Sequence, residues 1–192
     1  MKPYLILFVF AILFSCQQKH YKYPHVQIVT EYGDIEIELY ADKAPETVKA
    51  FLGYVDSGVF TNSSFHRTLK AEDQPSSSFK SELIQGGIWG KKNAPVFPGI
   101  RHENTKQTGI LHLDGTVSLA RTDTGTASTE FFICIGKQPA YDYGGEANTD
   151  KQGFAAFGRV VSGMDIVKKI HRQPDYESNL EKPVVIFKIS HL

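Results

Sequence analysis

A polar loop between two apolar segments is the part of this sequence best placed to present chemistry to a ligand. Residues 121–129 are Arg, Thr, Asp, Gly, Ala and Ser only, whereas the flanking segments 117–119 and 131–135 are rich in β-branched and aromatic residues. Such flanks favour β-strands. Loops between strands usually lie on the surface, where the strands fix the position of the groups that they display. We therefore expect a strand, a binding loop and a second strand over residues 115–136.

The same loop contains Asp123-Thr124-Gly125, a triplet that also occurs at the active site of aspartic proteases. An aspartate of that kind shares its proton with a second aspartate, and an apolar strand leads into it. Here the polar pair Arg121-Thr122 precedes Asp123, and the sequence has no second triplet of this type. An aspartic protease is therefore a remote alternative.

The histidines and cysteines do not imply a metal site. The seven histidines are scattered singly, and the two cysteines, Cys16 and Cys134, form no C-x-x-C pair. Cys134 lies in the apolar run FFICI, which is typical of a small buried residue. We expect neither a metal nor a cofactor.

The charge pattern indicates no polyanionic partner. The 192 residues include 21 basic and 21 acidic side chains, which are interspersed along the chain and give a net charge of zero. Proteins that bind nucleic acids or anionic membrane surfaces usually carry a basic patch. We expect no nucleic-acid partner, and we expect a monomer.

Four short blocks of the sequence together form a specific pattern. They are FHR at 65–67, IQGG at 84–87, S-x-x-F-F-I at 128–133 and FAAFGRV at 154–160. In order and approximate spacing they resemble the cyclophilin family of peptidyl-prolyl cis/trans isomerases. Each block alone is weakly specific, but four blocks in this order are hard to produce by chance. The resemblance covers about Val26 to Ile189, which is essentially the whole mature chain.

The resemblance implies a catalyst that needs neither a nucleophile nor a general acid. Isomerisation of an X-Pro bond is opposed by amide resonance, a barrier of roughly 18 to 20 kcal/mol. In the twisted amide the prolyl nitrogen regains a lone pair that accepts a hydrogen bond. About 7 kcal/mol of preferential binding to that state accelerates the reaction by roughly five orders of magnitude. A hydrogen-bond donor and an apolar pocket for the proline ring are sufficient.

The resemblance also implies roles for particular residues. Arg67 is the expected catalytic donor, because its guanidinium N–H groups stay charged at any relevant pH. The alternative is an exposed strand arginine in a surface ion pair. Gln85 is expected to bond the substrate backbone, and burial in the core is the alternative for each aromatic residue. The other substrate-binding residues that the resemblance implies are Leu83, Ala120, Arg121, Thr122, Phe132, Tyr141 and Phe154.

At several positions the chain departs from the family pattern. Glu82 stands where members often have phenylalanine, and Phe79 is a candidate to replace that ring. Phe154 stands where animal members carry a pocket histidine, so the wall keeps an aromatic ring but loses a polar edge. Arg121 and Glu130 replace the usual asparagine and glutamine of the loop; the asparagine commonly acts through its backbone. These departures leave open a non-catalytic module that binds proline peptides, or a chaperone, on the same fold.

Hydrophobic periodicity predicts the elements that carry these residues. Segments 26–30 and 35–40 alternate in polarity around a Tyr-Gly-Asp turn, which predicts a hairpin with one wet face. Apolar residues at i, i+3, i+4 and i+7 after Pro45 predict an amphipathic helix that ends before Gly58. Further strands are predicted at 64–68, 83–85, 110–113, 117–120, 131–135, 154–160 and 184–189, and a second short helix at 164–170.

Many short strands with closely spaced turns favour a sandwich or a barrel. The resemblance selects a mainly β fold, the closed eight-stranded antiparallel barrel capped by two helices. We expect residues 26–192 to form this one domain, a length that suits a single core. The Ser-, Lys- and acid-rich segment Lys70–Ser81 is predicted to be an insert, longer than the family usually carries there.

Residues 1–20 differ in composition from everything after them, and residues 1–16 of them are expected to be a signal peptide. Lys2 is the one charge before eleven apolar residues, a run too short to span about 30 Å of hydrocarbon as a helix. The run fits the core of a signal peptide. The sequence LFSC at 13–16 resembles the bacterial lipobox, in which the cysteine is lipidated and becomes the first mature residue.

We therefore expect a lipoprotein in which Cys16 is the lipidation site and residues 17–25 form a tether. The protein would then be held on a membrane of the bacterial cell envelope, facing the periplasm or the cell surface. Its expected partners are proline-containing segments of unfolded or exported proteins. An ordinary cleaved signal and an uncleaved anchor are the alternatives.

Overall fold

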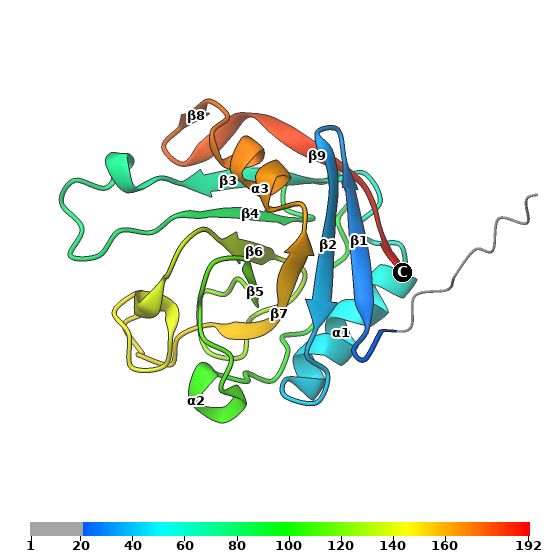
Figure 1. Ribbon diagram of the computed structural model, residues 1–192, viewed down its shortest axis with the longest axis horizontal. Helices are drawn as coiled ribbons and strands as arrows, with labels where there is room; N and C mark the ends of the chain where they lie inside the picture. The colour runs from blue at the N-terminus through cyan, green and yellow to red at the C-terminus, as the bar shows by residue number, and fades with distance from the viewer. Residues whose placement is uncertain (1–20) are drawn as a thin grey trace, which may run out of the picture.

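A single antiparallel sheet closes on itself in the computed structural model, which describes residues 21–192 (Figure 1). The strands are hydrogen-bonded in the order β1-β2-β7-β5-β6-β4-β3-β9, and β9 pairs again with β1, so that eight strands form a closed barrel. A short ninth strand, β8, pairs only with β9. The strands are β1 His25–Thr30, β2 Gly33–Leu39, β3 Ser63–Leu69, β4 Leu83–Gly87, β5 Thr116–Leu119, β6 Phe131–Cys134, β7 Ala155–Ser162, β8 Asp175–Tyr176 and β9 Asn179–His191. The expected fold class is confirmed.

The first hairpin illustrates how alternation builds the barrel wall. Ile28 in β1 is paired with Ile35 in β2, and both side chains are fully buried. Ile37 and Leu39 follow Ile35 on the inner face, while the intervening glutamates remain partly exposed. Because side chains alternate between the two faces of a strand, the apolar set fills the barrel and the polar set faces outward. The predicted hairpin is confirmed.

Two helices pack on the barrel on different sides in Figure 1, α1 at Pro45–Asp56 and α3 at Met164–His171. The buried face of α1 includes Phe51, which contacts barrel rings, and α3 contributes Val167 and Ile170 to the same apolar cluster. Both helices were predicted. A short α2, Thr105–Thr108, was not predicted, and neither were the 3₁₀ turns Ala71–Asp73 and Pro139–Tyr141.

The strand predicted at 110–113 does not form, and that prediction was wrong. Its backbone groups bond to side chains and to loop backbone instead of to a neighbouring strand. The His112 amide donates to Asp142 Oδ1 at 3.0 Å, and the Leu113 amide donates to Thr116 Oγ1 at 3.0 Å. The alternation of buried and exposed residues is still present, since Leu111 and Leu113 are exposed. Burial therefore alternates as it would along a strand, but His112 is buried and two leucines are exposed, the reverse of what side-chain polarity indicates.

The Lys70–Ser81 insert connects β3 to β4 and extends to the far left in Figure 1. Gln74 ties its two ends together, because its Nε2 donates to the carbonyls of Lys70 and Ser81, at 2.8 Å each. Phe79 near its end is half-buried and packs on a group of side chains outside the barrel. The insert is therefore an ordered extension of the β3–β4 hairpin.

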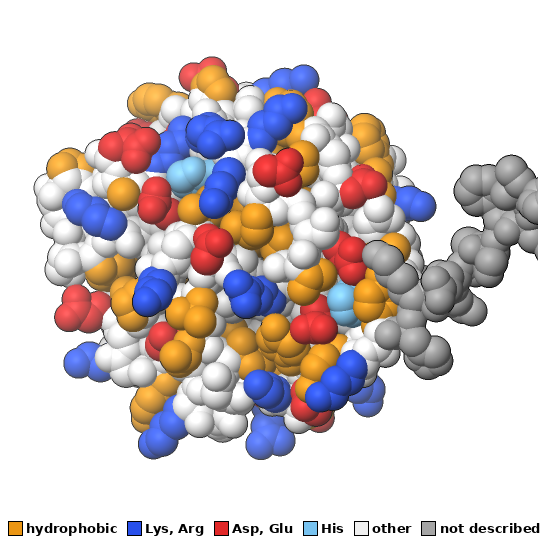
Figure 2. All heavy atoms as spheres, viewed as in Figure 1, with side chains coloured by type: hydrophobic (Ala, Val, Ile, Leu, Met, Phe, Trp, Pro, Cys, Tyr) orange, Lys and Arg blue, Asp and Glu red, His pale blue; other side chains and the backbone are white. Residues whose placement is uncertain are grey.

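Lys, Arg, Asp and Glu side chains are interspersed over the face of the molecule shown in Figure 2. Within residues 21–192, none of the helices has the length and apolar character that crossing a membrane requires. The same residues contain no cluster of three or more His, Cys, Asp or Glu side chains arranged to hold a metal ion. The predicted signal peptide, its Cys16 and the first part of the tether lie outside the described residues.

Candidate active site

A pocket of about 360 Å³ lies on the outside of the barrel, where the ends of β3, β4 and β6 meet two loops. We call it the outer pocket. It is lined by Arg67, Gln85, Ala120, Arg121, Thr122, Thr126, Ser128, Glu130, Phe132, Tyr141 and Phe154. All the residues for which the sequence implied a binding or catalytic role therefore line one cavity, apart from Leu83.

Strand register brings the polar and apolar parts of the outer pocket together. Arg67 in β3 is paired with Gln85 in β4, and Gln85 is paired in turn with Phe132 in β6. Directly paired residues point to the same side of a sheet. The Arg67 Nη1 donates to Gln85 Oε1 at 3.2 Å. A guanidinium, a carboxamide and an aromatic ring therefore form one row across three strands.

A bulge in β3 turns Arg67 outward. The pairing of β3 with both of its neighbours shifts between Phe65 and Arg67, so His66 is an extra residue in the strand. Phe65 is fully buried inside the barrel, whereas Arg67, two residues later, lines the outer pocket. In a regular strand these two side chains would share a face. The bulge is therefore what places the guanidinium at the pocket.

Three aromatic rings form the apolar wall. The ring of Phe132 meets the ring of Phe154 edge to face, with centroids 5.3 Å apart, and that of Tyr141 at 5.4 Å. The rings of Tyr141 and Phe154 are 5.0 Å apart. Phe132 is only 2% exposed, so most of its surface is used for packing. The three rings offer a rigid apolar surface to one side of the pocket.

The wall is supported from behind by buried side chains. Leu83 does not line the pocket but packs with Phe132 and Cys134 in the same cluster, and burial raises the pKa of the Cys134 thiol. The Tyr141 hydroxyl donates to Ser81 Oγ at 2.9 Å. His112 is stacked on the far side of Phe132. Phe79, the candidate replacement ring, packs against this cluster without lining the pocket.

The carboxylate of Glu130 occupies the end of the pocket next to β4. Its Oε1 accepts a hydrogen bond from the Trp89 amide at 2.9 Å, and its Oε2 lies 3.5 Å from His66 Nε2. Gly87 makes room for it, because a Cβ at Gly87 would collide with the carboxylate. Gly86 lies close to Phe65, because an ideal Cβ at Gly86 would be 2.8 Å from Phe65 Cδ1. Both glycines therefore pack closely against their neighbours.

Burial changes the pKa values of Glu130 and His66. It raises the pKa of the Glu130 carboxyl above its ordinary value, because desolvation penalises the ionised form. It lowers the pKa of His66 for the same reason. The His66 ring also packs against Trp89, with centroids 5.0 Å apart.

The loop 120–130 forms the opposite rim. Its base is closed by a hydrogen bond from the Ala120 amide to the Glu130 carbonyl at 2.8 Å. Thr126 Oγ1 accepts from the amides of Thr122 and Asp123, at 3.3 and 3.1 Å, which holds the tip in a turn. Asp123 is exposed in that turn and does not line the pocket. Arg121 reaches the pocket, but its guanidinium turns toward Asp150 and Gly153.

Some lining residues were not predicted. Thr126 and Ser128 belong to the loop that the sequence singled out, so treating the whole loop as a rim would have included them. Glu130 was noted only as a departure from the family pattern. Asp150 does not line the pocket, and Arg121 is the lining residue that it contacts. No sequence pattern indicated this contact, because Asp150 lies in an irregular loop 29 residues after Arg121.

The arrangement favours hydrogen bonding and apolar binding over covalent catalysis. In the described part of the chain, no histidine or cysteine lines the outer pocket, so it holds neither a Ser-His nor a Cys-His pair. Arg67 offers charged N–H donors opposite the three rings. A donor that faces an apolar pocket can stabilise a polar group next to a bound ring.

The chain was compared with known proteins. The family model of cyclophilin type peptidyl-prolyl cis-trans isomerases matches residues 25–191. Peptidyl-prolyl cis-trans isomerase A of Dickeya dadantii is 33% identical over 168 residues, which cover 84% of this chain and 81% of the relative. Peptidyl-prolyl cis-trans isomerase B of Escherichia coli is 34% identical over 149 residues, which cover 73% and 80%.

Solved structures show the same fold. A cyclophilin type peptidyl-prolyl cis-trans isomerase of Cryptosporidium parvum superposes with a TM-score of 0.69 at 22% identity, covering 88% of this chain and 98% of that one. A second structure of it, in the presence of the dipeptide Ala-Pro, gives a TM-score of 0.67 at 23% identity and the same coverage. Because the family model spans nearly all of the described chain and the bacterial relatives match most of its length, the chain belongs to the cyclophilin-type peptidyl-prolyl cis-trans isomerases and is an enzyme of that activity.

Proposed function

We propose that the outer pocket is the active site and that Arg67 is its catalytic residue. The proline ring of the substrate binds against Phe132, Tyr141 and Phe154. The Arg67 guanidinium then lies beside the X-Pro amide and donates a hydrogen bond to the prolyl nitrogen as the amide twists. The C–N bond of the amide rotates, and no covalent bond is formed or broken.

The observation that carries this proposal is the row formed by Arg67, Gln85 and Phe132 across three paired strands. Arg67 and the Phe132 ring are both fixed on strands of the barrel wall, so their separation is set by strand spacing. Preorganised donors cost little reorganisation when the amide twists. The hydrogen bond from Arg67 to Gln85 holds the guanidinium at the pocket before substrate arrives.

Peptide segments that contain proline are the substrates that this site suits. Gln85 and the backbone of Ala120 and Thr122 lie around the pocket, where they can pair with the peptide on either side of the proline. A related enzyme of Cryptosporidium parvum was crystallised in the presence of Ala-Pro, which supports this class of ligand.

The test is isomerisation of a short X-Pro peptide, followed by coupled proteolysis of the trans form. Arg67→Ala is expected to lower kcat/KM by one to several orders of magnitude without changing the melting temperature, because the twisted amide loses its donor. Arg67→Lys keeps the charge but not the planar fork, so an intermediate loss is expected.

Arg159→Ala is the matched control, because Arg159 is an exposed strand arginine on β7. It should leave the rate unchanged. An Arg67→Ala enzyme as active as the Arg159→Ala enzyme would remove Arg67 from the mechanism, while the family assignment would stand.

We further propose that the enzyme acts on exported proteins while anchored by lipid at Cys16. The support is the N-terminal sequence, an apolar signal-like run followed by LFSC. One acyl chain binds membranes only marginally, so stable anchoring needs several chains, and lipoprotein modification attaches them at one cysteine.

Cys16→Ser tests the anchor. Wild type is expected in the membrane fraction and in the detergent phase, and the variant in the soluble fraction with unchanged activity on small peptides. Mass spectrometry of the mature N-terminus checks for acyl chains. A soluble wild type without acyl chains would mean an ordinary secretory signal, and the isomerase assignment would be unaffected.

A further inference from the structure

Two arginines line the outer pocket, and their guanidinium groups are used differently. The Arg67 guanidinium makes a single hydrogen bond within the described part of the chain, to Gln85. The Arg121 side chain is only 1% exposed, and its guanidinium makes four hydrogen bonds inside the protein. Because a guanidinium carries five N–H groups, Arg121 has little hydrogen-bonding capacity left for a substrate.

The four bonds join Arg121 to the segment that leads into β7. Nη1 and Nη2 donate to the two carboxylate oxygens of Asp150, each at 2.8 Å. Nε and Nη2 also donate to the Gly153 carbonyl, at 2.9 and 2.7 Å. Paired bonds of this kind fix orientation as well as distance. We call this ion pair the Arg121–Asp150 clamp.

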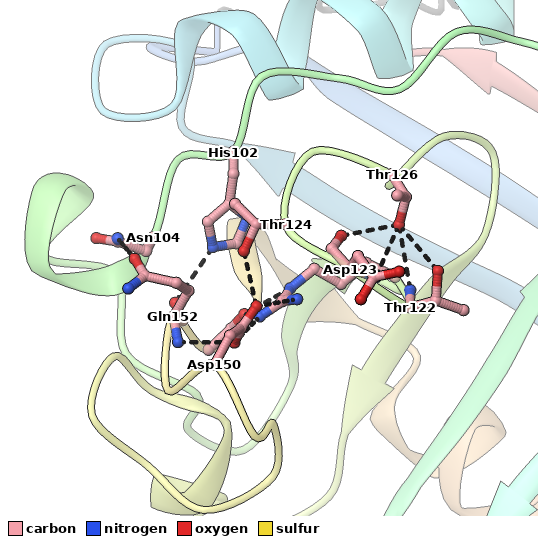
Figure 3. A network of polar contacts seen from close by, with 10 residues as sticks. His102, Asn104, Thr122, Asp123, Thr124, Thr126, Asp150 and Gln152 are labelled. Carbon is pink, nitrogen blue, oxygen red and sulfur yellow. Dashed lines mark hydrogen bonds and ion pairs between the residues drawn. The ribbon is translucent and has the colours of Figure 1, made fainter.

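Asp150 also belongs to a wider polar network, in which it contacts Thr124 and Gln152 (Figure 3). Thr124 Oγ1 donates to Asp150 Oδ2 at 2.7 Å, and the Gln152 amide donates to Asp150 Oδ1 at 2.9 Å. Hydrogen bonding from Arg121 holds the pKa of the Asp150 carboxyl far below its ordinary value. The clamp therefore stays ionised at any pH used to assay the enzyme.

The clamp lies directly against the aromatic wall. The Arg121 Cζ is 5.5 Å from the centroid of the Phe154 ring, within the range of a cation–π contact. Gly153, which accepts two of the four bonds, is the residue before Phe154. The Phe154 ring also packs on Tyr141 and Phe132. The ring therefore contacts both the clamp and the rest of the wall.

We propose that Arg121 and Asp150 are positioning residues, which hold Phe154 in the wall so that the pocket for the proline ring is formed before substrate binds. The inference rests on the proposed function, because it takes the outer pocket as the site of proline binding. A preformed pocket avoids the free-energy cost of ordering a loop on binding. A wall that contacts the ring equally in the ground and transition states changes KM and leaves kcat unaltered.

Asp150→Asn tests the clamp in the full chain. It removes the charge of the carboxylate at nearly constant shape, and a rise in KM for an X-Pro peptide of about five- to tenfold is expected, with kcat nearly constant. Asp123→Asn is the matched control, because it is the same change at an exposed aspartate of the loop next to the clamp. That control should leave both constants unchanged.

A second background separates positioning from a general loss of stability. If the clamp acts through the Phe154 ring, Asp150→Asn raises KM in the wild-type background but causes no further rise in a Phe154→Ala enzyme. Asp150→Glu, which can still pair with Arg121, is expected to recover part of the lost affinity. An equal rise in KM in both backgrounds, or a fall in kcat alone, would overturn the inference.

Arg67→Ala in the same assays keeps the two proposals distinguishable. If Arg67→Ala retains the wild-type kcat while Asp150→Asn raises KM, the catalytic role of Arg67 fails and the clamp stands. If Arg67→Ala loses activity while Asp150→Asn leaves KM unchanged, the clamp alone fails.

Discussion

Phe131 and Phe132 are neighbours in β6, yet they belong to two different regions of the molecule. Phe131 points into the barrel, where its ring meets the rings of Phe51, Phe60 and Phe65 edge to face or nearly so. Phe132 points outward and forms the wall of the outer pocket. Both side chains are almost fully buried, at 0% and 2% exposure. Burial alone therefore does not distinguish a residue of the core from a residue of the site.

The two regions differ in how they are held together. The barrel interior is enclosed by paired strands and covered by α1 and α3, and its apolar side chains fill it. The outer pocket has one wall of strand residues, and loops held by polar contacts such as the Arg121–Asp150 clamp form the rest. A core packed on every side contributes mainly stability. A wall with one open side retains apolar surface that a ligand can cover.

Replacing each phenylalanine by alanine should separate the two regions. Phe131→Ala is expected to lower the free energy of unfolding by about 3 to 5 kcal/mol, because it leaves a closed cavity. Phe132→Ala is expected to cost less, since water can enter the space it leaves, but to weaken the binding of X-Pro peptides. Denaturant unfolding and steady-state kinetics on both variants provide the measurement.

If the two regions differ as described, one variant should lose mainly stability and the other mainly affinity for the substrate. Phe131→Ala should be the less stable protein and should keep the wild-type KM at a temperature where it is folded. If Phe132→Ala is equally destabilised and binds substrate normally, the outward ring belongs to the core and the pocket is misplaced.

Gly86 and Gly87 repeat the comparison on β4, with a smaller expected effect. An alanine Cβ at Gly86 would press on Phe65 in the interior, whereas at Gly87 it would press on the Glu130 carboxylate at the pocket. Gly87 also has φ of 152°, which disfavours any side chain. Each alanine substitution is expected to cost about 1 to 3 kcal/mol of stability.

Glu130→Ala tests which side chain collides with the added methyl group in each glycine variant. Combined with Gly87→Ala it should recover part of the lost stability, because the colliding carboxylate is gone. Combined with Gly86→Ala it should recover none, since Phe65 is still in place. Equal recovery in both backgrounds would mean that the two glycines do not divide the interior from the pocket as described.

The dependence of stability on pH is expected to arise in part at the pocket, from His66 and Glu130, and is the smallest of the three effects. The pKa of His66 is lowered by burial from an ordinary value of 6.5, so its contribution to stability is present above pH 6.5 and is lost as pH falls through the folded-state pKa. The pKa of Glu130 is raised from 4.5, so its contribution is present below pH 4.5 and is lost as pH rises through the folded-state pKa.

Substitutions of His66 and of Glu130 should therefore change the loss of stability on acidification in opposite directions. Below pH 6.5, His66→Gln should lose less stability on acidification than wild type, and Glu130→Gln should lose more. The free energy of unfolding from denaturant titrations between pH 7.5 and pH 5 gives the slopes. Parallel slopes for all three proteins would contradict the assigned burial of the two groups.

Much of the fold was predictable because it depends on local patterns. Alternation predicted the first hairpin and the inner set Ile35, Ile37 and Leu39, and helical spacing predicted α1. The family resemblance implied the closed barrel and eight of the eleven residues that line the outer pocket. These features depend on residue type and short spacing, which a sequence shows directly.

Features that depend on contacts between distant segments were decided only by the tertiary structure. The sequence does not reveal the bulge at His66, because a strand with one extra residue reads like any other strand, although the bulge is what turns Arg67 outward. It does not reveal that Glu103 caps α1 by accepting from the Thr47 amide at 2.8 Å across 56 residues.

The partner of Arg121 illustrates the same limit at the site itself. The family pattern implies a residue that acts through its backbone at this position, and the chemistry of an arginine side chain suggests a free cation. The structure instead places Asp150 and the Gly153 carbonyl within hydrogen-bond distance of the guanidinium. Sequence determines which charges exist and which faces are apolar, but only the folded chain decides which distant groups meet, because that depends on how the barrel brings its loops together.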